Sequence, residues 1–159
     1  MIALPGDLMR LKTGFITHQV NCAGLFGAGL AKIIADRWPK VRDLYLYKYK
    51  KNGWSLGDIQ IVNVGDPQDN LYVVNCASQC DVGTNYRRTD YNAIRICLMR
   101  LSLMRKKHYG DNLPIYFPHG YGCGLGGGDW RVVSAIIESV IPDAIIIVKR
   151  NASWEADPT

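Results

Sequence analysis

Cysteine in this chain lacks the spacing that binds a metal. The five cysteines are odd in number and form no C-x-x-C pair, and Cys76 and Cys80 are separated by three residues with no histidine nearby. Zinc sites and disulfide frameworks both need closer or paired spacings. We therefore expect reduced thiols, no metal and no cofactor, in a cytoplasmic protein.

Long hydrophobic runs and single-sign charge blocks are missing as well. No apolar stretch reaches the length that crosses a membrane, and no signal-peptide pattern is visible, so we expect no membrane association. The formal net charge of +5 suits an anionic ligand but is too evenly spread to indicate nucleic acid. Arg87-Arg88 and residues 105–107 are the tight basic clusters. The second cluster is expected to be solvated at a helix C-terminus, where cations are favoured.

Two familiar phosphate-binding signatures are absent, although glycine is concentrated in one place. There is no G-x-x-x-x-G-K-[ST] and no G-x-G-x-x-G after the first predicted strand, which argues against a P-loop and a dinucleotide fold. Six of the sixteen glycines nevertheless lie within residues 120–128, between an apolar run at 113–117 and a helical pattern at 129–141. A strand, a glycine loop and a helix N-terminus in this order form an anion site, so the segment predicts phosphate binding.

Another glycine loop lies earlier in the chain, at residues 21–30, again between a predicted strand (15–21) and a predicted helix (29–37). One such loop alone is as readily a tight turn as a ligand site. Two loops with the same order of elements favour a ligand, and together they could hold a diphosphate from both sides.

The remaining pattern predicts an α/β fold, a three-layer α/β/α sandwich with a mixed central sheet. Strands are expected at residues 2–4, 15–21, 58–64, 71–76, 113–117 and 144–148, and helices at 29–37, 41–50, 90–107 and 129–141. The short separation between 58–64 and 71–76 predicts antiparallel pairing. We expect one domain at residues 1–149 and a polar tail at 150–159. Ligands of such folds gather at the carboxyl ends of the strands.

Several short motifs make the chain recognisable as a set. They are Gly6-Asp7-Leu8, the run HQVNCAGLFGAGLA at residues 18–31, Ala77-Ser78-Gln79, Thr89-Asp90-Tyr91, and Gly122-Cys123-Gly124-Leu125 ahead of Trp130. In this order they resemble a macrodomain, the ADP-ribose-binding fold, of the type that processes ADP-ribose 1″-phosphate. The resemblance extends from about residue 2 to residue 148.

The resemblance implies a set of ligand-binding residues. Asp7 is expected to accept a hydrogen bond from the adenine amino group beside the Leu8 backbone, and Asn21 to lie near the distal ribose. Phe26 and Tyr121 are expected either to flank that ribose or to pack in the core. The implied diphosphate loops consist of Gly27, Ala28, Gly29 and Leu30 on one side, and of Gly120, Tyr121, Gly122, Cys123, Gly124 and Leu125 on the other.

The chain also departs from the hydrolytic macrodomains. Gly24 stands where many of them carry a second asparagine. The branch that removes ADP-ribose from glutamate uses a lysine and an aspartate, and those positions are Cys76 and Gly126 here. The nearest carboxylate, Asp129, is expected to cap the helix that follows.

His18 is the residue left to carry chemistry. Its context, H-x-x-N-C-x-G-x-x-G-x-G, resembles the yeast-type phosphatases that act on ADP-ribose 1″-phosphate, in which this histidine is implicated in catalysis. An imidazole of near-neutral pKa can act as a general acid or nucleophile. The alternative is a half-buried strand histidine bonded to backbone. His119, which directly precedes the glycine segment at residues 120–128, is a further candidate.

Three functions follow from these residues. The first is a phosphatase that converts ADP-ribose 1″-phosphate to ADP-ribose. The second is a non-catalytic module that binds ADP-ribose, and the third is a hydrolase acting on ADP-ribosylated protein or nucleic acid. The expected partner is ADP-ribose or a derivative of it, with an ADP-ribosylated macromolecule as a further candidate.

Overall fold

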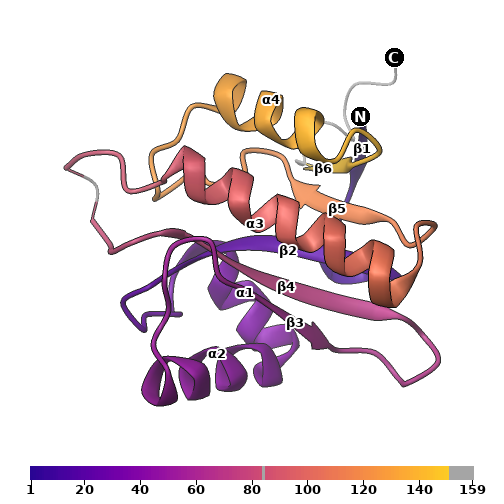
Figure 1. Cartoon of the computed structure of the whole chain (residues 1–159), viewed down its shortest axis with the longest axis horizontal. Coiled ribbons are helices and arrows are strands. Elements are labelled where there is room, and N and C mark those ends of the chain that lie inside the picture. Colours follow the sequence, from indigo (N-terminus) through magenta and orange to yellow (C-terminus); the bar gives the residue numbers. More distant parts are fainter. Residues whose placement is uncertain (84, 151–159) are drawn as a thin grey trace.

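The computed structural model describes residues 1–83 and 85–150. Figure 1 shows a central sheet with helices on both faces. The strands are β1 (Ile2–Gly6), β2 (Gly14–Asn21), β3 (Ile59–Asn63), β4 (Leu71–Gln79), β5 (Ile115–Pro118) and β6 (Ile145–Lys149). The α-helices are α1 (Gly29–Arg37), α2 (Pro39–Lys51), α3 (Tyr91–Met104) and α4 (Trp130–Val140).

The sheet has the order β1-β6-β5-β2-β4-β3 and is mixed. Strands β3 and β4 pair antiparallel, whereas the other neighbours pair parallel. The predicted mixed sheet and the predicted antiparallel pair are therefore confirmed. Because β5, β2 and β4 are parallel neighbours, their carboxyl ends meet at one edge of the sheet, and the loops that follow them come together there (Figure 1).

Two apolar layers hold the helices onto the sheet. Ile16 of β2 belongs to the cluster that packs against α1 and α2, and the adjacent Phe15 belongs to the cluster against α3 and α4. Successive strand residues point to opposite faces, so a strand covered on both sides is apolar at nearly every position. This explains the near-continuous hydrophobic runs and confirms the three-layer α/β/α fold.

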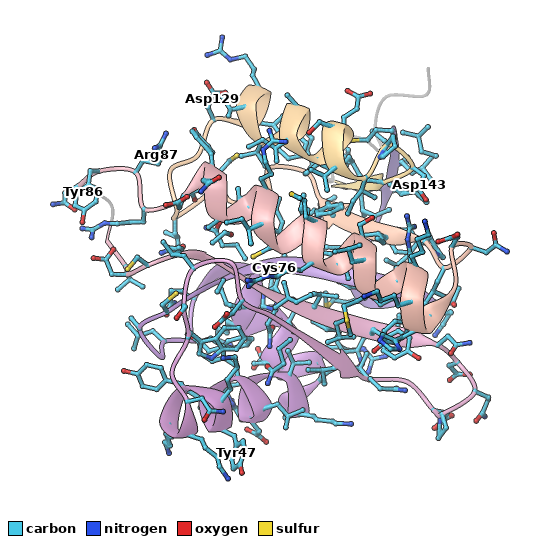
Figure 2. All side chains as sticks on the ribbon, viewed as in Figure 1. Tyr47, Cys76, Tyr86, Arg87, Asp129 and Asp143 are labelled. Atoms are coloured by element: carbon cyan, nitrogen blue, oxygen red, sulfur yellow. The ribbon has the colours of Figure 1, made fainter. Side chains whose placement is uncertain are left out.

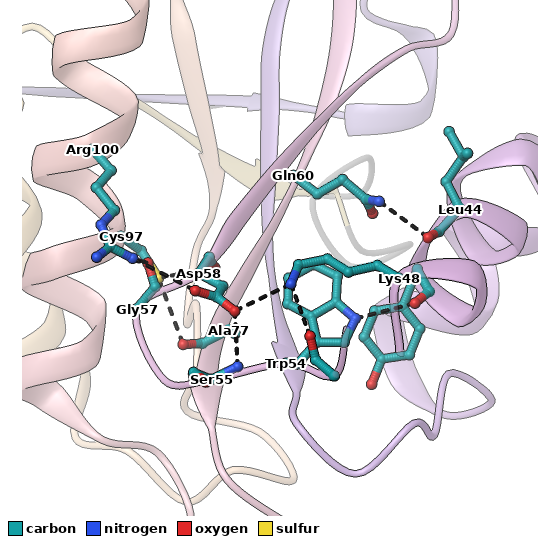
Figure 3. A network of polar contacts seen from close by, with 12 residues as sticks. Leu44, Lys48, Trp54, Ser55, Gly57, Asp58, Gln60, Ala77, Cys97 and Arg100 are labelled. Atoms are coloured by element: carbon teal, nitrogen blue, oxygen red, sulfur yellow. Dashed lines mark hydrogen bonds and ion pairs between the residues drawn. The ribbon is translucent and has the colours of Figure 1, made fainter. Parts of the chain in front are cut away.

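A polar network lies just before β3, at the β3 edge of the sheet (Figure 3). The Asp58 carboxylate lies 3.2 Å from Lys48 Nζ of α2 and 3.7 Å from Arg100 Nη1 of α3. The Lys48 ammonium also lies over the Trp54 ring, 4.6 Å from its centroid. One half-buried carboxylate thus links helices from the two outer layers just ahead of β3.

The predicted helix at 90–107 is correct at its start and wrong at its end. Asp90 caps the N-terminus as expected, its side chain accepting from the Ala93 N–H, but α3 ends at Met104 and a π-helical turn, Arg105–Tyr109, follows. Arg105 is only 8% exposed, and its guanidinium donates to both carboxylate oxygens of Asp143 at 2.9 and 3.0 Å. Those bonds lower the pKa of Asp143. Arg105 was expected to be solvated, and a partner distant in sequence is the reason that it is not.

Some expectations concern features that the structure covers only in part. Within residues 1–83 and 85–150 all five cysteines are free thiols, and no helix there has the length and apolar character to cross a membrane. The predicted tail, beyond Arg150, lies outside the described residues.

Candidate functional site: a cleft between two glycine loops

A cleft of about 940 Å³ opens at the carboxyl ends of β2, β4 and β5. One wall is residues 22–28, named here the first glycine loop, and the other is residues 119–129, the second glycine loop. The lining contains, from the first side, His18, Gln19, Val20, Asn21, Gly24, Leu25, Phe26, Gly27, Ala28, Gly29, Leu30, Ala31, Arg42 and Leu46. From the other side it contains Gln79, Val82, Gly83, Pro118, His119, Gly120, Tyr121, Gly122, Gly124, Leu125 and Gly126. Both loops that the sequence singled out therefore line one cleft.

Asn21 shapes the first glycine loop. Its side-chain Oδ1 accepts from the N–H groups of Ala23 at 2.9 Å and Leu25 at 3.3 Å, and Nδ2 donates to the Leu25 carbonyl at 2.7 Å. The Tyr45 hydroxyl of α2 also reaches Oδ1, at 2.9 Å. The amide that the resemblance places near a ribose is thus bonded within its own loop, where it fixes the backbone that faces the cleft.

The first glycine loop leads into a helix whose N-terminus is uncapped. Ala28 is the N-cap of α1 and has no side-chain acceptor for the free N–H groups of the first turn. Gly29 begins the helix with φ of +57°, and Ala28 to Ala31 all line the cleft. Free N–H groups and the positive end of the helix dipole make this wall an anion site.

The second glycine loop leads into a helix that is already capped. Asp129 accepts from the Arg131 N–H at 2.9 Å, and its other carboxylate oxygen lies 2.8 Å from Arg131 Nη2. These bonds lower the pKa of Asp129. The expected helix cap is confirmed, but a carboxylate occupies the anion position of α4, whose residues do not line the cleft. The N-terminus of α4 is therefore less free to bind an anion than that of α1, and its part in phosphate binding stays a prediction.

Close packing explains several glycines of the second loop. A Cβ on Gly126 would lie 2.3 Å from Thr89 Oγ1 and 2.7 Å from Gln19 Nε2. The Gly126 carbonyl also accepts from the N–H groups of Arg88 and Thr89. An aspartate, which the lysine–aspartate hydrolases carry at this position, has no room here unless Thr89 moves.

Other glycines of this loop are open toward the cleft. A Cβ on Gly120 or on Gly124 would meet no atom within 4 Å. The exposed Leu125 reaches across the mouth, where its Cδ1 lies 3.8 Å from the position of a Cβ on Gly29. The second loop thus supplies an open backbone surface opposite the uncapped end of α1.

His18 lies at the floor of the cleft and is 1% exposed. Its Nε2 lies 2.5 Å from Oδ1 of Asn75 on β4, and the Phe26 ring packs edge-on at a centroid distance of 5.5 Å. Burial lowers the pKa of His18 to about 4, against the opposing effect of the hydrogen bond to Asn75. His18 is therefore neutral at pH 7, and its partner is a side chain rather than the backbone that the alternative interpretation assumed.

Phe26 and Tyr121 pack in the core and also form part of the cleft lining. Both line the cleft, yet both are buried, at 7% and 2% exposure. Phe26 packs against Tyr45 at a ring distance of 5.0 Å, and Tyr121 against Phe117 at 5.7 Å. Burial raises the pKa of the Tyr121 hydroxyl well above its usual value.

Asp7, Leu8 and Cys123 are the predicted site residues that do not line the cleft. Asp7 Oδ1 accepts from the Met9 N–H at 2.9 Å and so caps a short 3₁₀ turn. Leu8 is buried in the core beneath α1 and α2, and the Cys123 thiol lies 3.3 Å from the Tyr121 carbonyl. Asp7 follows β1, which is separated from the cleft strands by β6.

Other lining residues were not predicted. Arg42 comes from α2 and supplies a guanidinium to a lining that contains no carboxylate in the described part of the chain. No sequence signal could have found it, because α2 reaches the cleft only through the fold. Gln19 and Gln79 were within reach, since both lie in motifs that the resemblance quotes. Figure 2 shows Tyr86 and Arg87 projecting from the loop after β4 at this same end.

Among the described residues, no cluster of three or more His, Cys, Asp or Glu side chains is placed to bind a metal ion.

No family model matches the chain. In sequence it is similar to proteins named DNA ADP-ribosyl glycohydrolase in Mycobacterium bovis and Mycobacterium tuberculosis, with 27% identity over 146 residues to each. The match covers 89% of this chain but 40% of those relatives, so the chain spans less than half of their length.

Solved structures share the fold over nearly the whole chain. A Bacteroides thetaiotaomicron protein of unknown function has a TM-score of 0.82 and 27% identity, covering 94% of this chain and 98% of its own. The macrodomain of Mycobacterium tuberculosis DarG has a TM-score of 0.73 and 23% identity, covering 96% and 99%. A Streptomyces coelicolor macrodomain has a TM-score of 0.75 and 22% identity, covering 96% and 100%. The α/β sandwich with its cleft at the carboxyl edge is the macrodomain fold.

Proposed function

We propose that this protein binds ADP-ribose in the cleft between its two glycine loops. The observation that carries the proposal is the uncapped N-terminus of α1, which faces a cleft whose described lining has no carboxylate. Free N–H groups, a helix dipole and the Arg42 guanidinium all favour an anion there. The motif resemblance identifies that anion as the diphosphate of ADP-ribose.

The order of the strands suggests how the ligand lies. With the diphosphate between Gly29 and Gly124, the adenine extends toward Asp7, which follows β1 at the far edge of the sheet. The distal ribose then lies on the opposite side, above β2 and β4, near Phe26 and His18. Asp7 Oδ1 serves the 3₁₀ turn, which leaves Oδ2 for the adenine amino group.

The reaction that we propose is hydrolysis at C1″ of the distal ribose. Water attacks C1″ and the bond between C1″ and the attached group breaks. The water oxygen stays on C1″ as the hydroxyl of the released ADP-ribose, and the departing group takes up the proton. ADP-ribosylated DNA is our first choice of substrate, since the curated relatives that cover most of this chain carry the name DNA ADP-ribosyl glycohydrolase. The described lining has no carboxylate, and together with Arg42 and the nearby Arg87 it suits a polyanion.

A phosphatase acting on ADP-ribose 1″-phosphate is the second candidate, because two histidines line the same cleft. His18 is neutral and buried and cannot act as a general acid at pH 7. In this reaction the ring nitrogen of His18 that carries no proton would act as the nucleophile. The exposed His119 would be the proton donor to the leaving group.

The test begins with calorimetric titration of ADP-ribose into the protein. Turnover is then measured on ADP-ribosylated DNA, ADP-ribosylated protein and ADP-ribose 1″-phosphate, each with His18→Ala, His119→Ala and Gly124→Val beside the wild type. We expect micromolar ADP-ribose binding that Gly124→Val abolishes without loss of the fold, because its added Cβ enters only the cleft.

The results of these assays distinguish the candidate functions. Release of ADP-ribose from DNA supports the first reaction, and phosphate release lost in His119→Ala supports the second. Binding without turnover on any substrate makes the protein an ADP-ribose-binding module. A wild type that fails to bind ADP-ribose overturns the proposal as a whole.

A further inference from the structure

A row of polar side chains crosses the face of the sheet that α1 and α2 otherwise cover with apolar residues. His18 of β2 stands in register with Asn75 of β4, and Asn75 with Gln60 of β3. His18 Nε2 lies 2.5 Å from Asn75 Oδ1, and Asn75 Nδ2 lies 3.0 Å from Gln60 Oε1. The row ends where Gln60 Nε2 donates to the Leu44 carbonyl of α2 at 3.0 Å (Figure 3).

This row determines which nitrogen of His18 carries the proton. The Leu44 carbonyl can only accept, so Gln60 must present its NH₂ group to it and its Oε1 to Asn75. Asn75 must then donate with Nδ2 and turn Oδ1 toward His18. A carbonyl oxygen at Nε2 requires a proton there, which leaves Nδ1 of the neutral ring as a bare acceptor.

Nδ1 is the orphan of this arrangement. It is buried and has no hydrogen-bond partner among the described residues, although its ring lines the cleft. A buried acceptor without a donor is costly, and a polar row inside an apolar layer is no more stabilising than a well-packed apolar one. The row is therefore explained by the acceptor that it orients rather than by stability.

Phe26 is the aromatic side chain next to His18 in the lining of the cleft. Its ring packs edge-on to the imidazole, and it sits between the exposed Leu25 and Gly27. A Cβ on Gly27 would meet no atom within 4 Å, so this part of the first glycine loop is not tightly enclosed.

We propose that Nδ1 of His18 is a fixed acceptor for a hydroxyl of the distal ribose, and that Asn75 and Gln60 are positioning residues that hold the required tautomer. The inference rests on the proposed binding of ADP-ribose in this cleft. A bare nitrogen repels phosphate and carbonyl oxygens and selects a hydroxyl donor. The row of His18, Asn75 and Gln60, called the relay below, thus contributes to discrimination between ADP-ribose and ADP. ADP has the same adenosine and diphosphate but no distal ribose.

Two variants of Gln60 separate the relay from simple stability. Both Gln60→Met and Gln60→Glu lose the bond to the Leu44 carbonyl. A glutamate still accepts from Asn75 Nδ2 and preserves its orientation, whereas methionine cannot and lets the Asn75 amide turn over. Gln60 does not line the cleft, so neither change touches the ligand. Ile61→Val, on the same strand but packed toward α3, is the matched control for loss of a small core group.

The measurements are affinities for ADP-ribose and for ADP, together with long-range ¹H–¹⁵N spectra that report which His18 nitrogen is protonated. We expect Gln60→Met to weaken ADP-ribose binding by about tenfold, the worth of one hydrogen bond, with ADP changed by less than about twofold. Its spectrum should show protonation at Nδ1. Gln60→Glu and Ile61→Val should keep the wild-type spectrum and the wild-type ratio of the two affinities.

The opposing outcomes are distinct. A wild-type spectrum with Nδ1 protonated, or a Gln60→Met variant with an unchanged affinity ratio, overturns the relay while ADP-ribose binding stands. Equal losses in Gln60→Met and Gln60→Glu assign the row a structural role and also overturn it. A wild type that binds neither nucleotide fails the proposed function itself.

Discussion

The two glycine loops of the cleft follow equivalent strands and precede equivalent helices, yet they differ in what they offer a ligand. The first loop has few glycines, an internal asparagine brace and a helix N-terminus without a cap. The second has six glycines within residues 120–128, but its helix is capped by Asp129. The loop with less glycine therefore leads into the helix whose N-terminus has no side-chain cap.

The difference shows that glycine density has two physical causes. Gly126 is required because Thr89 and Gln19 occupy the space of a side chain, and Gly128 because its Cβ would lie 2.7 Å from the Gly122 carbonyl. Gly124 is open and faces the cleft. Packing and ligand access thus alternate within one short segment, and substitutions can separate them.

The largest expected effect is on packing of the second loop. Gly126→Ala should destabilise the fold by about 3 kcal/mol, because the new methyl group overlaps Thr89 Oγ1 and Gln19 Nε2. Urea unfolding measures the change, with Gly124→Ala as the control at an open position. Equal stability of the two variants would remove the distinction between packing glycines and open glycines.

Acid should destabilise the fold through His18, the buried histidine at the floor of the cleft. The pKa of His18 is about 4 in the fold against an ordinary 6.5, so the unfolded chain binds more protons between these values and stability falls as the pH drops through that window. The full loss is roughly 3 kcal/mol, present below pH 4 and absent above pH 6.5. Thermal melts between pH 7.5 and 4 should show a weaker dependence of the melting temperature on pH for His18→Gln than for the wild type. An equal pH dependence in the two proteins would contradict the buried, neutral histidine.

Capping the first helix should exchange ligand affinity for stability. Ala28→Asp places a carboxylate on the free N–H groups of α1, where Ala28 already has the extended backbone of an N-cap. We expect ADP-ribose affinity to fall by about tenfold or more and the helix to gain about 1 kcal/mol. Titration calorimetry and thermal melts provide the two values, and Ala28→Ser, a neutral cap, is the control for charge. Undiminished binding in Ala28→Asp would place the diphosphate elsewhere.

The reverse change at the second loop should have the smallest effect. Asp129→Ala removes the cap of α4, and we expect a loss of about 1 kcal/mol in stability with no change in ADP-ribose affinity. Asp129→Asn, which retains the cap without the charge, should lose less. A marked change in affinity in either variant would mean that the N-terminus of α4 contributes to the ligand site after all.

Much of this arrangement could be predicted from the sequence because it depends on local order. The mixed three-layer fold, the antiparallel β3–β4 pair, the Asp90 and Asp129 caps and the two loops of the cleft all follow from patterns over a few residues. His18 could be singled out but not interpreted, since its environment depends on Asn75 and Gln60 from other strands. Arg42 reaches the cleft and Arg105 reaches Asp143 only through the fold, and no local pattern indicates either contact.

Hydrophobic periodicity and glycine positions set the elements and their order, so the amino-acid pattern alone predicts two strand–loop–helix units that meet at one edge of a mixed sheet. Contacts between distant residues settle three further properties: which of the two helices has a free N-terminus, which glycines are required by neighbouring side chains, and which nitrogen of His18 carries no proton. These properties depend on atoms brought together from distant parts of the chain, and the fold supplies those neighbours.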